Sequence, residues 1–105
     1  MNYYCICSLK KFIFENNQTF PDTIPIVNDF GLTTQIKDIN CKYLLIDFWF
    51  RGCAPCITAS KILNKLHTKY LDKSEFKIIG INVKDTALHL FQKYLDNFKI
   101  EYEQY

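Results

Sequence analysis

The chain has 105 residues, of which 49% are hydrophobic and 23% are charged. This length suits one small domain, and this composition excludes an intrinsically disordered chain. The formal net charge of +2 is too small to indicate a nucleic-acid-binding protein, and no apolar run reaches the length of a transmembrane helix.

The first part of the chain is predicted to be mostly extended. Residues 3–14 mix aromatic and aliphatic side chains, which predicts an edge strand. Pro21 and Pro25 make residues 19–26 a poor central strand, because proline cannot donate to a sheet ladder. In residues 26–34 the apolar positions are interrupted by polar residues and a glycine, which predicts a small hairpin or a bulged strand.

The middle of the chain contains a strand followed by a helix, with two cysteines at their junction. Residues 43–50 form a short apolar run of strand composition and length. The motif Cys53-Ala54-Pro55-Cys56 follows, and Pro55 suits the first turn of a helix, where its absent N–H costs nothing. A helix is predicted over residues 54–70 by apolar residues at spacings of three and four, which are Ala59, Ile62, Leu63, Leu66 and Tyr70.

This position at a helix N-terminus favours cysteine reactivity. Exposed N–H groups and the positive end of the helix dipole favour thiolate over thiol, and they lower a cysteine pKa from about 8.5 to as little as roughly 3.5–7.5. Cys53 and Cys56 are three residues apart, so their sulfurs lie on the same face of the turn. The alternatives are an inert motif or half of a zinc site, to which Cys5 and Cys7 would add a second pair of ligands.

The rest of the chain predicts an α/β fold. A polar turn at residues 71–75 leads into a predicted strand at 76–83. Asp85 or Thr86 can cap a second helix, predicted over residues 87–98. The order strand, helix, strand, helix predicts two parallel strands joined by a right-handed crossover.

The triplet Asp47-Phe48-Trp49 and the cysteine motif beginning at Cys53 resemble the thioredoxin superfamily, in particular the TlpA/ResA-like thiol-disulfide oxidoreductases with an AhpC/TSA-type domain. The resemblance covers residues 24–104 and implies a thioredoxin-like α/β fold with an N-terminal hairpin and a short helical turn at 35–40. It divides the chain into an extension at 1–23 and a domain at 24–105. The family's last two strands, its cis-proline and its last helix have no counterpart, so we expect an incomplete fold.

The resemblance implies an enzyme that exchanges electrons with protein disulfides or dithiols. Cys53 would be the nucleophile that forms a mixed disulfide, and Cys56 would resolve it. Asp47 falls where the family carries a buried acid that assists proton transfer from the resolving thiol; burial would raise its pKa to suit a general base. The alternative is an aspartate whose side chain faces the surface. We expect no separate cofactor and no metal, because the two sulfurs themselves carry the electrons.

Residues around the motif are expected to form the substrate surface. Gly52 stands where the family often has Trp, and it leaves Arg51 as the nearby positive charge for the Cys53 thiolate. The alternatives are core packing for Trp49 and a simple solvated charge for Arg51. His67 and His89 are expected to be surface residues. The complete predicted substrate surface is Trp49, Arg51, Gly52, Ala54 and Pro55.

A second hypothesis belongs to another functional class. The chain would be a truncated or degenerate thioredoxin-like module that binds or supports other proteins without turnover. Without the family's last strands, the strand beside the active site would lack a neighbour on one side. Such an unpaired edge favours association, so a homodimer through the exposed sheet edge is the corresponding prediction.

The compartment stays open at the level of sequence. The resembling family usually works outside the cytoplasm, in the periplasm or cell envelope, but the start of this chain shows no signal peptide. If the motif cysteines form a disulfide, Cys5, Cys7 and Cys41 remain as three further thiols. An odd set of thiols fits an oxidising compartment poorly, so the cytoplasm is an alternative.

Overall fold

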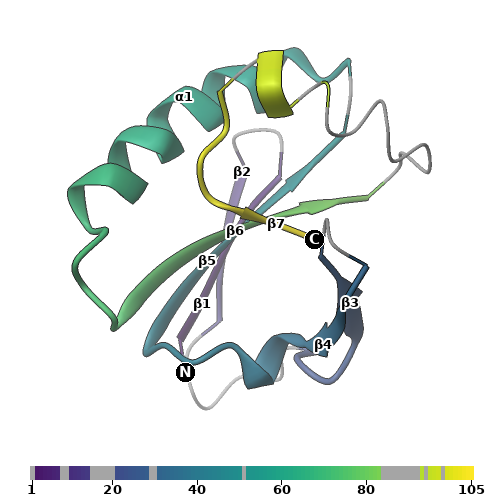
Figure 1. The fold of residues 1–105 in the computed structure, drawn as a ribbon, viewed down its shortest axis with the longest axis vertical. Helices are drawn as coiled ribbons and strands as arrows, with labels where there is room; N and C mark the ends of the chain where they lie inside the picture. The colour runs from purple at the N-terminus through teal and green to yellow at the C-terminus, as the bar shows by residue number, and fades with distance from the viewer. Residues whose placement is uncertain are drawn as a thin grey trace.

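The computed structural model describes residues 2–7, 10–14, 21–28, 31–50, 52–83, 93, 95–97 and 99–105. Its centre is a five-stranded sheet in the order β2-β1-β5-β6-β7. Helix α1 covers one face of this sheet, and the small hairpin β3–β4 lies on the other side (Figure 1). This layered arrangement confirms the predicted α/β fold class.

The central strands and α1 agree with the sequence prediction. Strand β5 spans Tyr43–Trp49, α1 spans Ala54–Lys69 and β6 spans Phe76–Asn82. β5 and β6 are parallel along their whole length. The buried side of α1 differs from the predicted stripe, since Ile62 is 54% exposed whereas Cys56 and Ser60 are buried. The buried face of α1 is therefore turned away from Ile62 and toward Cys56 and Ser60.

The N-terminal segment corrects two expectations. Instead of one edge strand, it forms β1 (Asn2–Cys7) and β2 (Lys10–Phe14), which are antiparallel. β1 also runs parallel to β5, with Tyr3 opposite Leu44 and Cys5 opposite Ile46. Strand β5 therefore has a neighbour on both sides. Tyr3 and Cys5 explain this placement, because they bury against the same apolar face as the β5 residues opposite them. The boundary between residues 23 and 24 stays a prediction.

One face of the sheet has an almost wholly apolar core. It is covered by β3 (Pro25–Val27), β4 (Thr33–Gln35) and the short 3-10 helix η1 (Ile36–Asp38), which confirm the predicted hairpin and helical turn. Leu44 and Ile46 of β5 are fully buried on this face. The cluster of buried residues here comprises Tyr3, Cys5, Ile26, Ile36, Ile39, Leu44, Ile46 and Ile79.

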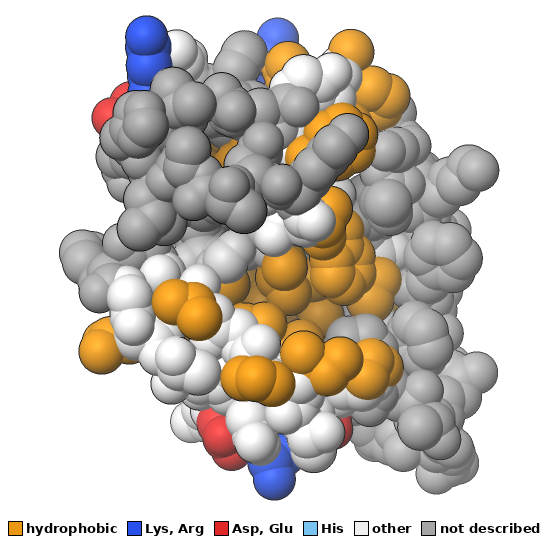
Figure 2. Space-filling view, turned by 90° about the vertical axis from the view of Figure 1, so that its right-hand side faces the viewer, with side chains coloured by type: hydrophobic (Ala, Val, Ile, Leu, Met, Phe, Trp, Pro, Cys, Tyr) orange, Lys and Arg blue, Asp and Glu red, His pale blue; other side chains and the backbone are white. Residues whose placement is uncertain are grey.

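The surface beside this hairpin keeps apolar side chains in contact with solvent. Figure 2 shows the face that carries β3–β4, where hydrophobic side chains gather in a hollow of the surface. In and around the hairpin, Val27 is 50% exposed and Leu32 is 67% exposed.

No helix among the described residues is long and apolar enough to cross a membrane.

The C-terminal end adds a strand that the sequence does not predict. Strand β7 has only two residues, Glu103–Gln104, and runs parallel to β6 at the edge of the sheet. A two-residue polar strand carries no recognisable pattern of its own. Most of the helix predicted at 87–98 lies outside the described residues, although residues 93 and 95–97 are helical and Leu95 is buried.

Candidate active site

The two motif cysteines lie in the turn that joins β5 to α1. The N–H of Cys53 donates to the carbonyl oxygen of Phe50 at 3.4 Å, which closes this turn. Gly52 has a φ of 82°, a left-handed conformation that glycine adopts without steric cost. The local backbone therefore gives a reason for glycine at this position.

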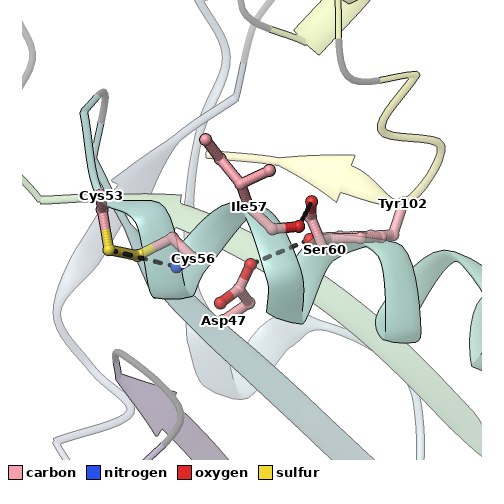
Figure 3. The surroundings of a disulfide bond; sticks show 6 residues. All are labelled: Asp47, Cys53, Cys56, Ile57, Ser60 and Tyr102. Carbon is pink, nitrogen blue, oxygen red and sulfur yellow. Dashed lines mark hydrogen bonds between the residues drawn. A yellow bond between two sulfur atoms is a disulfide. The ribbon is translucent and has the colours of Figure 1, made fainter.

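Cys53 and Cys56 form a disulfide at the N-terminus of α1 (Figure 3). Their Cα atoms are 5.2 Å apart, within the usual range for a disulfide. Cys53 is the N-cap residue, and its Sγ accepts a hydrogen bond from the backbone N–H of Cys56 at 3.2 Å. The first turn of α1 contains no acidic residue. The sulfurs therefore meet the positive end of the helix with no negative side chain of that turn beside them.

The disulfide is more buried than the sequence suggests. Cys53 is the more exposed of the two, but only 4% of it is accessible, against 2% for Cys56. Both cysteines pack in an apolar cluster with Trp49 and Leu95. The exposed residues nearest to the sulfurs along the chain are Gly52, Ala54 and Pro55.

Asp47 lies beneath α1 and has a single tyrosine as its described hydrogen-bond partner. It is only 2% exposed, and in Figure 3 it lies between the disulfide on one side and Tyr102 on the other. The Tyr102 hydroxyl donates to Oδ2 of Asp47 at 2.9 Å. Burial raises the pKa of Asp47 from 3.8 to about 6, and the hydrogen bond from Tyr102 opposes this rise. The carboxyl group is therefore easier to protonate than that of an exposed aspartate.

Trp49 is held by a second residue from the C-terminal segment. Its Nε1–H donates to Oε1 of Gln104 at 2.8 Å, and Nε2 of Gln104 donates to the carbonyl oxygen of Tyr102 at 3.1 Å. Trp49 is only 2% exposed. Trp49 packs in the same cluster as Cys53 and Cys56, so its burial favours the alternative of core packing, and a contribution to the substrate surface stays a prediction.

Gly80 leaves room for the Gln104 side chain. Gly80 of β6 lies opposite Asp47 of β5 on one side and opposite Gln104 of β7 on the other. A Cβ added to Gly80 would collide with the Gln104 side chain, for example at 2.7 Å from Nε2. The glycine therefore allows a side chain from the edge strand to pass over β6 and reach β5.

Sequence reasoning missed Tyr102, Gln104 and Gly80. The available signal is weak: Tyr102 and Gln104 are two residues apart and hence face the same side of an extended segment. Nothing in the sequence indicates that this side faces Asp47, which is 55 residues away along the chain. Their contribution follows only from the sheet order.

The remaining candidates lie apart from the disulfide or outside the described residues. Arg51 and His89 belong to the undescribed residues, and His67 is half-buried on α1. Cys5 lies on the opposite face of the sheet, where burial raises the pKa of its thiol to about 11. Cys41 is half-buried, and burial raises the pKa of its thiol as well.

The described part of the chain contains no set of ligands for the zinc site that was the alternative to a redox pair. There, no three side chains of the types His, Cys, Asp and Glu come together in a way that could hold a metal ion. The side chain of Cys7, which belongs to that alternative, lies outside the described residues.

Comparisons with known proteins agree with this geometry. Residues 40–105 match a family model described as thioredoxin-like. The thiol-disulfide oxidoreductase ResA of Bacillus cereus is 29% identical over 58 residues, which are 55% of this chain and 33% of that protein. The chain thus spans about a third of the length of the curated relatives it matches.

Solved structures extend the similarity to the fold. The thioredoxin domain of a thiol-disulfide oxidoreductase from Bacteroides vulgatus superposes with a TM-score of 0.67 at 30% identity, over 77% of this chain and 56% of that chain. A thiol:disulfide interchange protein from a Bacteroides species gives 0.68 at 30% identity, over 77% of this chain and 52% of that chain.

Proposed function

The chain belongs to the thioredoxin-like family, and from this premise we propose that it is a thiol-disulfide oxidoreductase acting through Cys53 and Cys56. The observation that carries the proposal is the disulfide at the N-terminus of α1, with the buried carboxyl group of Asp47 beneath the same helix. The similar proteins of known structure are named for this activity, which further supports the proposal. The substrates would be protein disulfides or dithiols.

The proposed reaction begins with the reduced protein. The Cys53 thiolate attacks one sulfur of a substrate disulfide, so that the substrate S–S bond breaks and a mixed disulfide with Cys53 forms. The released substrate sulfur leaves as a thiolate and takes a proton from solvent. Cys56 then attacks Sγ of Cys53, which closes the intramolecular disulfide and releases the second substrate sulfur. The substrate gains two electrons, which the Cys53–Cys56 pair loses. The pair also gives up the one proton of Cys56, and solvent supplies the second proton of the substrate dithiol.

The site supplies electrostatic help for both steps. The backbone N–H of Cys56, which lies 3.2 Å from Sγ of Cys53, would donate to the Cys53 thiolate in the reduced protein. Asp47 would accept the proton of Cys56 as that thiol attacks, a role that suits a carboxyl group with a pKa of about 6. The sulfurs carry the electrons, so the proposal includes no bound cofactor or metal.

Substrate contact would occur at the exposed residues around the motif. Gly52, Ala54 and Pro55 are exposed and flank the cysteines in sequence. Arg51, as a positive charge beside the Cys53 thiolate, stays a prediction.

The family resemblance favours the periplasm or cell envelope as the compartment, and this too stays a prediction.

Cysteine substitutions with a disulfide-bonded protein substrate test this function. We expect the wild-type protein to reduce insulin in the presence of dithiothreitol, and Cys53→Ser to abolish this activity. When the reduced Cys56→Ser protein is mixed with insulin without dithiothreitol, it should accumulate a covalent mixed disulfide with the substrate, because the resolving thiol is absent. Cys41→Ser is the matched control, since this half-buried thiol lies outside the motif.

The pH dependence of alkylation separates the enzyme from a binding module. We expect peptide mass spectrometry to give a Cys53 pKa well below 8.5 in native buffer and about 8.5 in denaturant. A value of about 8.5 in both conditions, together with no insulin reduction, would favour the module without turnover. The structure weakens one argument for that module, because β1 occupies the side of β5 that was expected to be unpaired.

A further inference from the structure

The C-terminal segment around β7 reaches two residues of the active-site strand. Tyr102 donates to Asp47 at 2.9 Å, and Gln104 accepts from Trp49 at 2.8 Å. All four side chains are 4% exposed or less. The segment reaches β5 across β6, at the place where Gly80 has no side chain. Both contacts are therefore shielded from water and geometrically defined.

On this basis, and resting on the proposed function, we propose that Tyr102 is a positioning residue of the redox site, whose hydroxyl group holds the Asp47 carboxyl group for proton transfer from Cys56. In this step the S–H proton of Cys56 passes to the Asp47 carboxylate while the sulfur attacks Sγ of Cys53. The disulfide bond between Cys53 and the substrate breaks, and the substrate sulfur leaves as a thiolate. Tyr102 keeps its own proton and remains hydrogen-bonded to Oδ2.

The chemistry of the hydrogen bond explains why a hydroxyl is needed. A buried carboxylate loses its hydration, which favours the protonated form and makes Asp47 a poor proton acceptor at moderately acidic pH. A hydroxyl that donates to the carboxylate stabilises the ionised form. The bond also fixes one oxygen of Asp47 on the side away from the disulfide (Figure 3). Tyr102 therefore affects both the orientation and the charge of the acceptor.

Few other titratable groups face Asp47 from the described elements around it. These are Cys56 of α1 and Cys53, the N-cap residue of that helix. The residue of β6 opposite Asp47 is Gly80, which has no side chain. Tyr4 of β1 lies on the same face of the sheet, packed toward Leu45. Among the described residues no charged side chain contributes to the pKa shift of Asp47, so removal of the Tyr102 hydroxyl should act without compensation.

The test uses Tyr102→Phe, which removes the hydroxyl and keeps the ring. The reduced protein is mixed with dipyridyl disulfide and quenched with acid. Peptide mass spectrometry then follows the Cys53 mixed disulfide and its conversion to the Cys53–Cys56 disulfide. We expect the pH midpoint of the conversion to rise by about one unit in Tyr102→Phe, while formation of the mixed disulfide is unchanged. At acidic pH the conversion should be up to about tenfold slower, and at high pH the rates should converge.

Controls distinguish positioning from a general structural effect. Tyr105→Phe is the matched variant, since Tyr105 lies in the same segment and its hydroxyl donates to the exposed Glu103. It should leave the midpoint in place. In an Asp47→Asn background, Tyr102→Phe should produce no further shift, because the titrating group is already absent. Carboxyl NMR of the oxidised protein should show an increased Asp47 pKa in Tyr102→Phe, independently of any turnover.

Different failures have different meanings. If wild-type Cys53 forms no mixed disulfide, or if Cys56 never resolves it, the proposed function fails. If the wild-type protein completes both steps but Tyr102→Phe gives the same pH profile and the same Asp47 titration, only the role of Tyr102 is overturned. Equal slowing of both steps at every pH would also overturn it.

Discussion

The two faces of strand β5 differ in chemistry although their residues alternate along one short stretch of chain. Toward the β3–β4 hairpin, Leu44 and Ile46 are fully buried among apolar side chains. Toward α1, Asp47 and Trp49 are equally buried but each forms a hydrogen bond with a polar side chain from the C-terminal segment. One face therefore depends on packing, and the other depends on satisfied polar groups.

This difference separates stability from chemistry within a single strand. Apolar burial is insensitive to pH and needs only shape and volume to match. Buried polar groups are sensitive to pH and to the loss of one partner, because an unpaired group keeps its full desolvation cost. Substitutions on the apolar face should thus change the free energy of unfolding alone, and those on the α1 face should change the active site as well.

The largest expected effect lies on the apolar face. Ile46→Ala removes a side chain of zero exposure and leaves a cavity, so we expect a loss of about 2–5 kcal/mol in the free energy of unfolding. Urea denaturation measures this loss. Val27→Ala, at a residue that is 50% exposed, is the control and should stay within about 0.5 kcal/mol. Wherever Ile46→Ala remains folded, its alkylation pH profile should match the wild type; a changed profile would mean that the two faces are coupled.

On the α1 face, Asp47→Asn should increase the free energy of unfolding at neutral pH, whereas Ile46→Ala decreases it. Burial raises the pKa of Asp47 from 3.8 to about 6, so the folded protein binds this proton more tightly than the unfolded chain does. Stability from this group is therefore present below about pH 4 and is lost as the pH rises to about 6. Above that pH the ionised group costs about 3 kcal/mol, at about 1.4 kcal/mol per pKa unit.

Asparagine cannot ionise, and it keeps an oxygen for the Tyr102 hydroxyl. We expect Asp47→Asn to stabilise the oxidised protein by up to about 3 kcal/mol at neutral pH and to have little effect at about pH 3. Urea denaturation at both pH values measures the difference. Asp38→Asn, at an exposed position, is the control and should not reproduce it. A destabilised Asp47→Asn at neutral pH would contradict the assignment of a costly buried charge.

The sequence predicts those parts of the molecule whose signal is local. The strand pattern of residues 43–50 is long enough to be recognised, and β5 forms there. The same holds for the helix pattern of residues 54–70, where α1 forms. The buried position of Asp47 beneath the motif is what the family resemblance implies, and the structure places it there. These features need no information from distant parts of the chain.

Features that depend on strand order could not be predicted. The place of β1 beside β5 depends on pairing between segments about 40 residues apart in sequence, and the 3–14 run alone reads equally well as an edge strand. The contacts of Tyr102 and Gln104 depend on β7, which has only two residues. In the sequence, Gly80 is only a glycine within an apolar strand. Its role becomes evident in the structure, where the Gln104 side chain lies over it.

A smaller loss is expected from Gly80→Ala, which tests the polar contact across β6. The added methyl group would displace the Gln104 side chain, so Trp49 would lose the acceptor of its buried Nε1–H. We expect a loss of about 1–3 kcal/mol in the free energy of unfolding. Because the chain contains a single tryptophan, the fluorescence of Trp49 should change in the folded protein. Adding Gln104→Ala to this variant should cost little more, since both changes break the same contact.

The smallest effect tests whether burial, rather than the number of hydrogen bonds, distinguishes the two faces. In the β3–β4 hairpin the N–H of Leu32 donates to Oδ1 of Asn28 at 2.9 Å, much as Trp49 donates to Gln104, but here the bond is exposed. Water can replace the lost oxygen in Asn28→Ala, so we expect a loss of only about 0.5–1 kcal/mol by urea denaturation, with Trp49 fluorescence unchanged. If Asn28→Ala lowered the free energy of unfolding as much as Gly80→Ala does, the exposed and the buried hydrogen bond would contribute equally. Exclusion of water on the α1 face would then add nothing to the stability. The expected inequality would instead mean that the polar contacts of the active-site face matter because water is excluded from them.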